Sequence, residues 1–182
     1  MNICILNGMS NSNNIEDMVI ANLNKNNINH LKLRDMNIAP CACCDGCSVT
    51  GKCVKKDDAI KVIEGYRDSE IIIILTSIKY GIYSKELKKA IDRLLPIGES
   101  KLSVKEGYMI HNMRYKNKKV IAVGVLDKED KEQKESFSAL VKANYYNMDW
   151  KKYKQVIIYN TSEAAQQENC IRSILKEVIE NV

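Results

Sequence analysis

Short apolar runs alternate with amphipathic stretches along most of the chain. The apolar runs predict strands, and the stretches whose apolar residues recur every three or four positions predict helices. Ser84, for example, precedes a periodic apolar series that Pro96 ends, which is typical of a capped helix. Strands are expected near residues 2–7, 28–33, 70–76, 119–125 and 155–160. Helices are expected near residues 13–25, 57–67, 84–95, 131–147 and 162–180.

Five strand–helix units predict an α/β fold with a parallel sheet and helices on both faces. Most of the strands are almost continuously apolar, whereas the strand near 28–33 is more polar and is assigned to an edge. The strand order 2-1-3-4-5 of the flavodoxin-like doubly wound fold follows, with right-handed crossovers. Ligands of such sheets bind beyond the carboxyl ends of the strands, at the switch between the first and third strands.

Composition bounds the class of protein. The 182 residues suffice for one domain, so residues 1–182 are assigned to a single flavodoxin-like domain with a cysteine-rich insertion at about 38–56. No apolar run approaches the ~20 residues that span a membrane, and the N-terminus does not resemble a signal peptide. We therefore expect a soluble, cytoplasmic protein. The net charge of +5 includes no basic block that indicates a nucleic-acid partner.

Five of the seven cysteines lie in the stretch CACCDGCSVTGKC, residues 41–53. Cys41, Cys44, Cys47 and Cys53 have the spacing C-x2-C-x2-C-x5-C. In a reducing compartment such thiols serve metal binding or redox chemistry rather than structural disulfides. Three thiols at successive x2 spacing favour a [4Fe-4S] cluster over zinc, whose sites usually join two separated pairs. Zinc, and redox-active or structural thiols without a metal, stay open as alternatives.

The other cysteines are expected to be structural. Cys43 is out of step with the spacing and is expected to be filler, with a spare thiol near the cluster as the alternative. Cys4, in a strand, and Cys170, on a helical stripe, are expected in the core. Because the cysteine-rich loop follows the second strand, it emerges on the rim where the ligand binds. The cluster and the ligand are therefore expected to be neighbours.

The loop after the first strand reads NGMSNSNN, residues 7–14. Backbone N–H groups at the start of the following helix, together with Ser10, Ser12, Asn13 and Asn14, form a site for a phosphate monoester. The loop lacks the glycine patterns of dinucleotide and nucleoside-triphosphate sites, so a mononucleotide such as FMN fits better. A turn that only caps the helix is the alternative.

Three segments, in the order GMSNSNN, PCACCDGCSVTGKCVKKDD and TSIKYGIYSKELKKAIDRLLP, resemble the NADPH-dependent FMN reductase-like flavoproteins, and specifically their iron–sulfur flavoprotein branch. The resemblance spans residues 1–96 and implies that the phosphate of FMN is held by Ser10, Asn11, Ser12, Asn13 and Asn14. It implies that the isoalloxazine ring is lined by Thr76, Ser77, Ile78, Lys79, Tyr80 and Gly81, with the loop from Gly124 to Asp127 on the other side. The cluster ligands of the branch match Cys41, Cys44, Cys47 and Cys53.

These features predict an FMN-dependent oxidoreductase or electron-transfer flavoprotein that passes electrons between a reduced donor, FMN and a [4Fe-4S] cluster. The expected electron donor is NAD(P)H or a redox protein, and the expected redox partner is a small molecule or a protein. No side chain is assigned as catalytic, because the flavin itself carries out the redox chemistry. The alternatives are a cluster-free NAD(P)H-dependent FMN or quinone reductase, and a non-catalytic zinc-binding or thiol redox-sensing module. The resemblance also implies a homodimer or homotetramer.

Three further positions carry specific expectations. Lys79 and Tyr80 are candidates for tuning the flavin, since a cation near its N1 edge stabilises the anionic reduced ring; a solvent-facing lysine is the alternative for Lys79. Asp57 is expected to cap the helix that begins there. The segment 105–119, aromatic and basic, is expected to be a solvated connection, with contact to a nicotinamide phosphate, the cluster or another subunit as alternatives.

Overall fold

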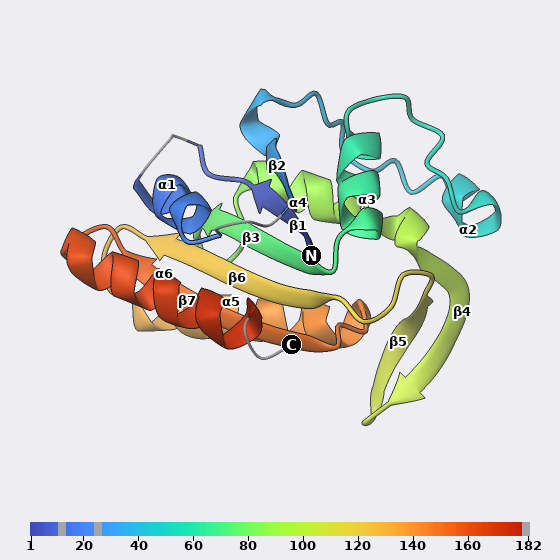
Figure 1. The fold of residues 1–182 in the computed structure, drawn as a ribbon. Helices are drawn as coiled ribbons and strands as arrows, with labels where there is room; N and C mark the ends of the chain where they lie inside the picture. The colour runs from blue at the N-terminus through green and yellow to red at the C-terminus, as the bar shows by residue number, and fades with distance from the viewer. Residues whose placement is uncertain (11–13, 24–26, 180–182) are drawn as a thin grey trace.

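The computed structural model describes residues 1–10, 14–23 and 27–179. Its main sheet has five parallel strands in the order β2-β1-β3-β6-β7, with helices on both faces (Figure 1). The strands are β1 (Asn2–Asn7), β2 (Asn27–Lys32), β3 (Ile71–Ser77), β6 (Lys119–Leu126) and β7 (Lys152–Tyr159). Counted within this sheet alone, the order is 2-1-3-4-5 with the second strand at an edge. The predicted fold is confirmed.

Alternate side chains of the strands enter two separate cores, because successive residues of a strand point to opposite faces. Ile3 and Ile5 of β1 belong to one core, and Cys4 and Leu6 to the other. The first core is covered by α1 (Asn14–Ala21) and α6 (Ala164–Ile179). The second is covered by α3 (Ala59–Asp68), α4 (Lys85–Asp92) and α5 (Lys131–Asn147). Two covered faces explain why the central strands are apolar throughout.

A two-stranded antiparallel hairpin, which the sequence pattern did not predict, projects from the body (Figure 1). It consists of β4 (Gly98–Lys105) and β5 (Tyr108–Met113), joined by Glu106 and Gly107, which both have positive φ. The sequence pattern did not reveal the hairpin because most of its apolar side chains, such as Val104 and Met109, are exposed, and only Ile110 and Met113 of β5 are buried. The segment 105–119 therefore contains a strand and is not only a connection.

Three short helices were also not predicted. They are the 3-10 turns η1 (Leu33–Asp35) and η2 (Leu95–Ile97), and α2 (Gly46–Thr50) within the cysteine-rich loop. Their brevity leaves no periodic apolar stripe to detect. Among the helices of the described residues, none combines the length and the apolar character that crossing a membrane requires.

Gly124 lies inside β6, where an added Cβ would sit 2.6 Å from Ile78 Cδ1 and 2.8 Å from Phe137 Cε1. We expect Gly124→Ala to lower the free energy of unfolding by about 1–3 kcal/mol, because the core around it has no room for a methyl group. Gly98→Ala is the matched control, since the nearest atom to its added Cβ is 3.6 Å away. Urea unfolding of the flavin-free protein measures both. Equal stability of the two variants would contradict the packing role.

Candidate functional site

The loops that follow β1, β3 and β6 are joined through their backbones at the carboxyl edge of the sheet. Gly8 N donates to Leu75 O at 2.8 Å, and Ile78 N donates to Val125 O at 2.8 Å. The three loops therefore form one continuous rim. This rim lies at the switch between β1 and β3, where ligands of doubly wound folds bind.

Ser84 attaches the start of α4 to this rim. Its hydroxyl donates to Gly8 O at 2.6 Å and accepts from Leu87 N at 3.4 Å, so the predicted helix cap is confirmed. Ser84 N donates to Thr76 Oγ1 at 2.9 Å. A Cβ on Gly8 would lie 2.6 Å from Leu87 Cβ, so the close approach of the helix requires glycine in the first loop.

The structure describes two of the predicted phosphate-binding residues, one on each side of the loop between β1 and α1. Ser10 is exposed and Asn14 begins α1, whereas Asn11, Ser12 and Asn13 lie outside the described residues. The turn starts where Met9 N donates to Asn7 Oδ1 at 3.0 Å. The N-terminal N–H groups of α1 therefore lie on the same rim as the loops after β3 and β6, which suits an anionic group.

Glu16 in the first turn of α1 is buried, which the sequence pattern did not indicate. Its carboxylate lies 3.0 Å from Lys32 Nζ, 3.6 Å from His30 Nε2 and 4.0 Å from Arg34 Nη1. Burial raises the pKa of Glu16, but the hydrogen bond and charge of Lys32, with His30, outweigh it and hold the pKa below its usual range. Lys32 and Arg34 offset a negative charge that would otherwise disfavour an anion at the start of the helix.

The residues predicted to line the flavin ring differ in what they can offer a ligand. The side chains of Thr76 and Ile78 are buried, so only their backbones face a ligand. Ser77 is half-buried at the end of β3. Gly124 lies within β6 and packs on Ile78 and Phe137, so its part in the rim is to let these side chains fit.

Lys79 to Ile82 form a tight turn that projects from the rim. Lys79 and Ile82 exchange backbone hydrogen bonds of 3.2 and 3.1 Å, and Tyr80 and Gly81 at the tip both have positive φ. Tyr80 is 94 % exposed. A non-glycine residue in this conformation is uncommon, and such strain gathers at functional sites.

Lys79 and Asp127, both predicted as flavin neighbours, form an ion pair of 3.0 Å between the loops after β3 and β6. Asn160 Nδ2 donates to the other carboxylate oxygen of Asp127 at 2.9 Å. The hydrogen bonds from Lys79 and Asn160 hold the pKa of Asp127 below its usual range. Because both side chains are exposed, solvent screens the pair, so it contributes little to stability and can rearrange around a ligand.

A second candidate site is a cavity of about 830 Å³ at the far end of α4. Its lining includes the five cysteines of the loop, Cys41, Cys43, Cys44, Cys47 and Cys53. Burial raises the pKa of Cys47, and the neighbouring thiols of Cys53, Cys41 and Cys44 raise it further, so the predicted set is close in space. Within residues 1–10, 14–23 and 27–179, however, no three His, Cys, Asp or Glu side chains converge as metal ligands. Four thiols are suitable ligands for a metal centre, but their sulfur atoms would have to move closer together to coordinate one metal.

The two candidate sites are separated by the length of α4. Ser84 contacts the first loop, and Arg93, at the other end of the helix, donates to Cys53 Sγ at 3.2 Å. Nine residues of helix correspond to about 14 Å. The expectation that the cysteines directly neighbour the rim is therefore wrong. The chain leaves β2 at the rim but then runs to α2, beyond the far end of α4 (Figure 1).

Asp57 has a larger role than the predicted helix cap. Its Oδ1 accepts from Ala59 N at 3.1 Å at the start of α3, as a cap does, but both carboxylate oxygens also bind Arg93 at 2.7 and 3.0 Å. The hydrogen bond from Arg93 holds the pKa of Asp57 below its usual range. The only sequence signal for this contact was weak: Arg93 stands directly before the apolar residues Leu94 and Leu95 that follow the helix, at a position close to the core.

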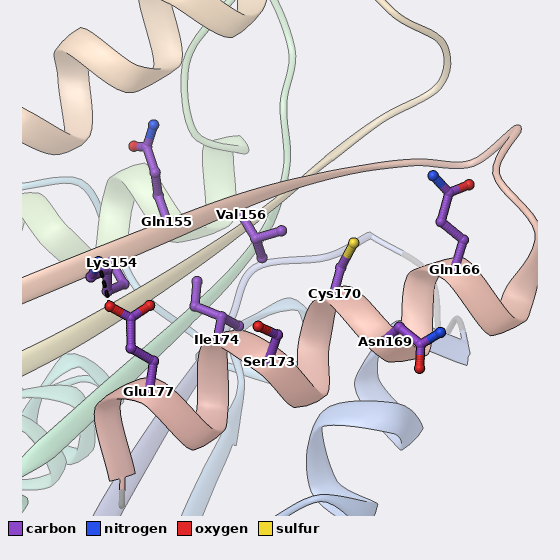
Figure 2. A pocket seen from close by; sticks show the side chains of 9 residues that line it. All are labelled: Lys154, Gln155, Val156, Gln166, Asn169, Cys170, Ser173, Ile174 and Glu177. Atoms are coloured by element: carbon purple, nitrogen blue, oxygen red, sulfur yellow. Dashed lines mark ion pairs between the residues drawn. The ribbon is translucent and has the colours of Figure 1, made fainter. Parts of the chain in front are cut away.

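The two isolated cysteines differ. Cys4 is fully buried, as predicted, and burial raises its pKa to about 12. The core prediction for Cys170 is wrong, since Cys170 is exposed. It points from α6 toward Val156 in a shallow groove of about 670 Å³ beside β7 (Figure 2). Because β7 is an edge strand, no further strand covers this side of the helix. Of the predicted site residues that the structure describes, none lines the groove.

Relatives of known sequence match parts of the chain. An iron–sulfur flavoprotein of Archaeoglobus fulgidus is 36 % identical over 63 residues, which are 35 % of this chain and 31 % of that protein. An iron–sulfur flavoprotein of Methanocaldococcus jannaschii is 30 % identical over 67 residues, 37 % of this chain and 35 % of that protein. The matched segments span about a third of the length of these relatives.

The fold has a counterpart among solved structures. An FMN-dependent NADH-azoreductase from Bacillus anthracis, solved in complex with FMN, superposes with a TM-score of 0.66 at 10 % identity, covering 99 % of this chain and 98 % of that chain. At this identity the likeness shows the fold alone. The model of the NADPH-dependent FMN reductase family, in contrast, matches residues 1–142. The chain therefore belongs to the NADPH-dependent FMN reductase family.

Proposed function

We propose that this protein is an FMN-dependent oxidoreductase whose cysteine-rich loop holds a [4Fe-4S] cluster. The donor is NAD(P)H or a reduced redox protein, and the acceptor is a small molecule or a redox protein. The observation that carries the FMN part is the family match over residues 1–142, which includes every loop of the rim. Bound FMN supplies hydride and single-electron transfer, and the protein supplies its position and electrostatic surroundings.

In this proposal the first loop and the start of α1 hold the phosphate of FMN, through backbone N–H groups and the side chains of Ser10, Asn11, Ser12, Asn13 and Asn14. The loop from Thr76 to Gly81 holds one edge of the ring, largely through its backbone, since Thr76 and Ile78 are buried. The exposed Tyr80 ring offers a stacking surface beside it. Asp127, in the loop after β6, forms the opposite wall of the site and orients Lys79 through their ion pair.

The cluster part of the proposal assigns Cys41, Cys44, Cys47 and Cys53 as ligands. Two relatives are named as iron–sulfur flavoproteins, and the four thiols share one cavity. A separation of about 14 Å along α4 keeps the two centres distinct. Assembly into a dimer or tetramer is part of the same proposal.

A cluster-free NAD(P)H-dependent reductase of flavins or quinones is the second candidate. One observation favours it, because the thiols of the described residues do not converge at ligand distances. Both candidates use the same rim and differ only in the cysteine cavity.

Anaerobic purification followed by quantification of flavin, iron and sulfide distinguishes the candidates. We expect one FMN with about four iron and four sulfide per chain, and absorption near ~450 nm for the flavin with a broad shoulder near ~400 nm. Cys44→Ser should lose iron, whereas Cys43→Ser, its matched control in the same exposed stretch, should keep it. Flavin without iron would contradict the cluster and support the cluster-free reductase. A colourless protein that contains zinc would contradict both candidates.

The ion pair of Lys79 and Asp127 predicts paired changes in the two-electron midpoint potential of bound FMN. Lys79→Met should lower the potential, because it removes a cation from the ring edge, and Asp127→Asn should raise it by leaving that cation uncompensated. Because both side chains are exposed, solvent and salt screen their charges, and each shift should be small, roughly 30 mV or less. Spectroelectrochemical titration measures both. Shifts of the same sign would contradict opposed charges at the ring edge, and no shift would mean that Lys79 faces only solvent.

A further inference from the structure

Arg93 ends α4 with a guanidinium that is almost completely buried, the residue being 2 % exposed. Nη1 donates to Ala39 O and to Asp57 Oδ2, both at 2.7 Å. Nη2 donates to Asp57 Oδ1 at 3.0 Å and to Cys53 Sγ at 3.2 Å. Because the planar guanidinium binds the carboxylate with two parallel N–H groups, Asp57 fixes its orientation.

These contacts join the two ends of the cysteine-rich loop. Ala39 lies at the start of the cysteine-rich insertion, Cys53 lies near its end, and Asp57 directly follows it. Asp57 Oδ2 also accepts from Ala39 N at 3.1 Å, and Lys55 Nζ donates to Pro40 O at 2.8 Å. One buried cation and its carboxylate therefore close the base of the loop and attach it to α4.

Cys53 is the thiol whose position depends most on such a group. Cys41, Cys44 and Cys47 are three residues apart, so local turns can bring their sulfurs together. Cys53 lies six residues beyond Cys47, past the end of α2. Its sulfur is held from outside the loop, by the hydrogen bond from Arg93.

Arg93 also retains an unused donor. Its Nε is buried and has no hydrogen-bond partner among the described residues, and the side chain contributes to the wall of the cysteine cavity. Four thiolates around one metal ion create a negative site. A buried cation that donates N–H groups to ligand sulfur stabilises such a site and orients the ligand.

We propose that Arg93 is the positioning residue for Cys53 as the fourth ligand of a metal centre, and that Asp57 orients Arg93 for this role. The inference rests on the proposed cysteine-bound centre. It adds that three ligands are supplied by the loop itself and that the fourth is set by a residue of α4. Metal binding and the packing of the loop base on α4 are therefore coupled.

Cobalt(II), added to the reduced, metal-free full-length protein, tests this without cluster assembly. The wild-type protein should bind one cobalt per chain with thiolate-to-cobalt absorption, and the metal should protect Cys41, Cys44, Cys47 and Cys53 from iodoacetamide in peptide mass spectrometry. Arg93→Lys keeps the positive charge but loses the planar guanidinium that donates two parallel hydrogen bonds. The substitution should weaken cobalt binding about 10–100-fold, which is the usual effect of removing a group that orients a metal ligand. It should also remove the protection from iodoacetamide at Cys53 alone.

Lys88→Gln is the matched control, because it removes a cation from an exposed ion pair with Asp92 on the same helix and should change neither readout. If circular dichroism shows that Arg93→Lys does not fold, Asp57→Asn removes the orienting carboxylate and should weaken binding in the same direction. Unchanged affinity with the same four protected cysteines in a folded variant overturns the proposal. So does a wild-type protein that forms no cobalt–thiolate bond. Cobalt bound as expected, but no cluster after anaerobic purification, supports the role of Arg93 and contradicts only the cluster.

Discussion

The buried ion pair between Arg93 and Asp57 decides where the cysteine-rich loop lies. Burying a guanidinium and a carboxylate costs several kcal/mol per ion, and their bidentate contact with further hydrogen bonds to Ala39 offsets that cost. The pair fixes the loop to the end of α4. Without it, the topology alone would leave the loop on the rim from which it starts.

The helix that carries Arg93 is anchored at its other end by Ser84, which binds the carbonyl of Gly8. One short element therefore contacts both candidate sites. A change in the first loop has a direct structural route to the base of the cysteine-rich loop, through eight residues of helix. The same arrangement keeps the thiols apart from the rim, so that each site has its own electrostatic surroundings.

The sequence pattern predicted the strands and helices whose apolar residues recur with a regular period. The central strands were identifiable because both faces are buried, and β2 was placed at the edge because polar residues such as His30 and Lys32 interrupt it. The hairpin of β4 and β5 was not predicted, because most of its apolar residues are exposed and do not contribute to a core. Cys170 was misplaced because a helical stripe does not reveal that β7 ends the sheet.

The candidate site was predictable in part. The cysteine set and the loops after β1 and β3 follow from spacing and topology, but the path of the cysteine-rich loop depends on a contact between Asp57 and Arg93, 36 residues apart. The buried Glu16 and its cations are likewise tertiary features. The sequence does not reveal which residues pair in either case, because the partners come from different elements.

Anomalous diffraction at the iron absorption edge, from crystals of the anaerobically purified protein, tests the central claim most directly. The account predicts iron beside Cys53 and Arg93, with FMN density at Gly8 and Ser84, about one α4 length away. Iron beside Ser84, or cysteines without iron in a flavin-loaded protein, would contradict it.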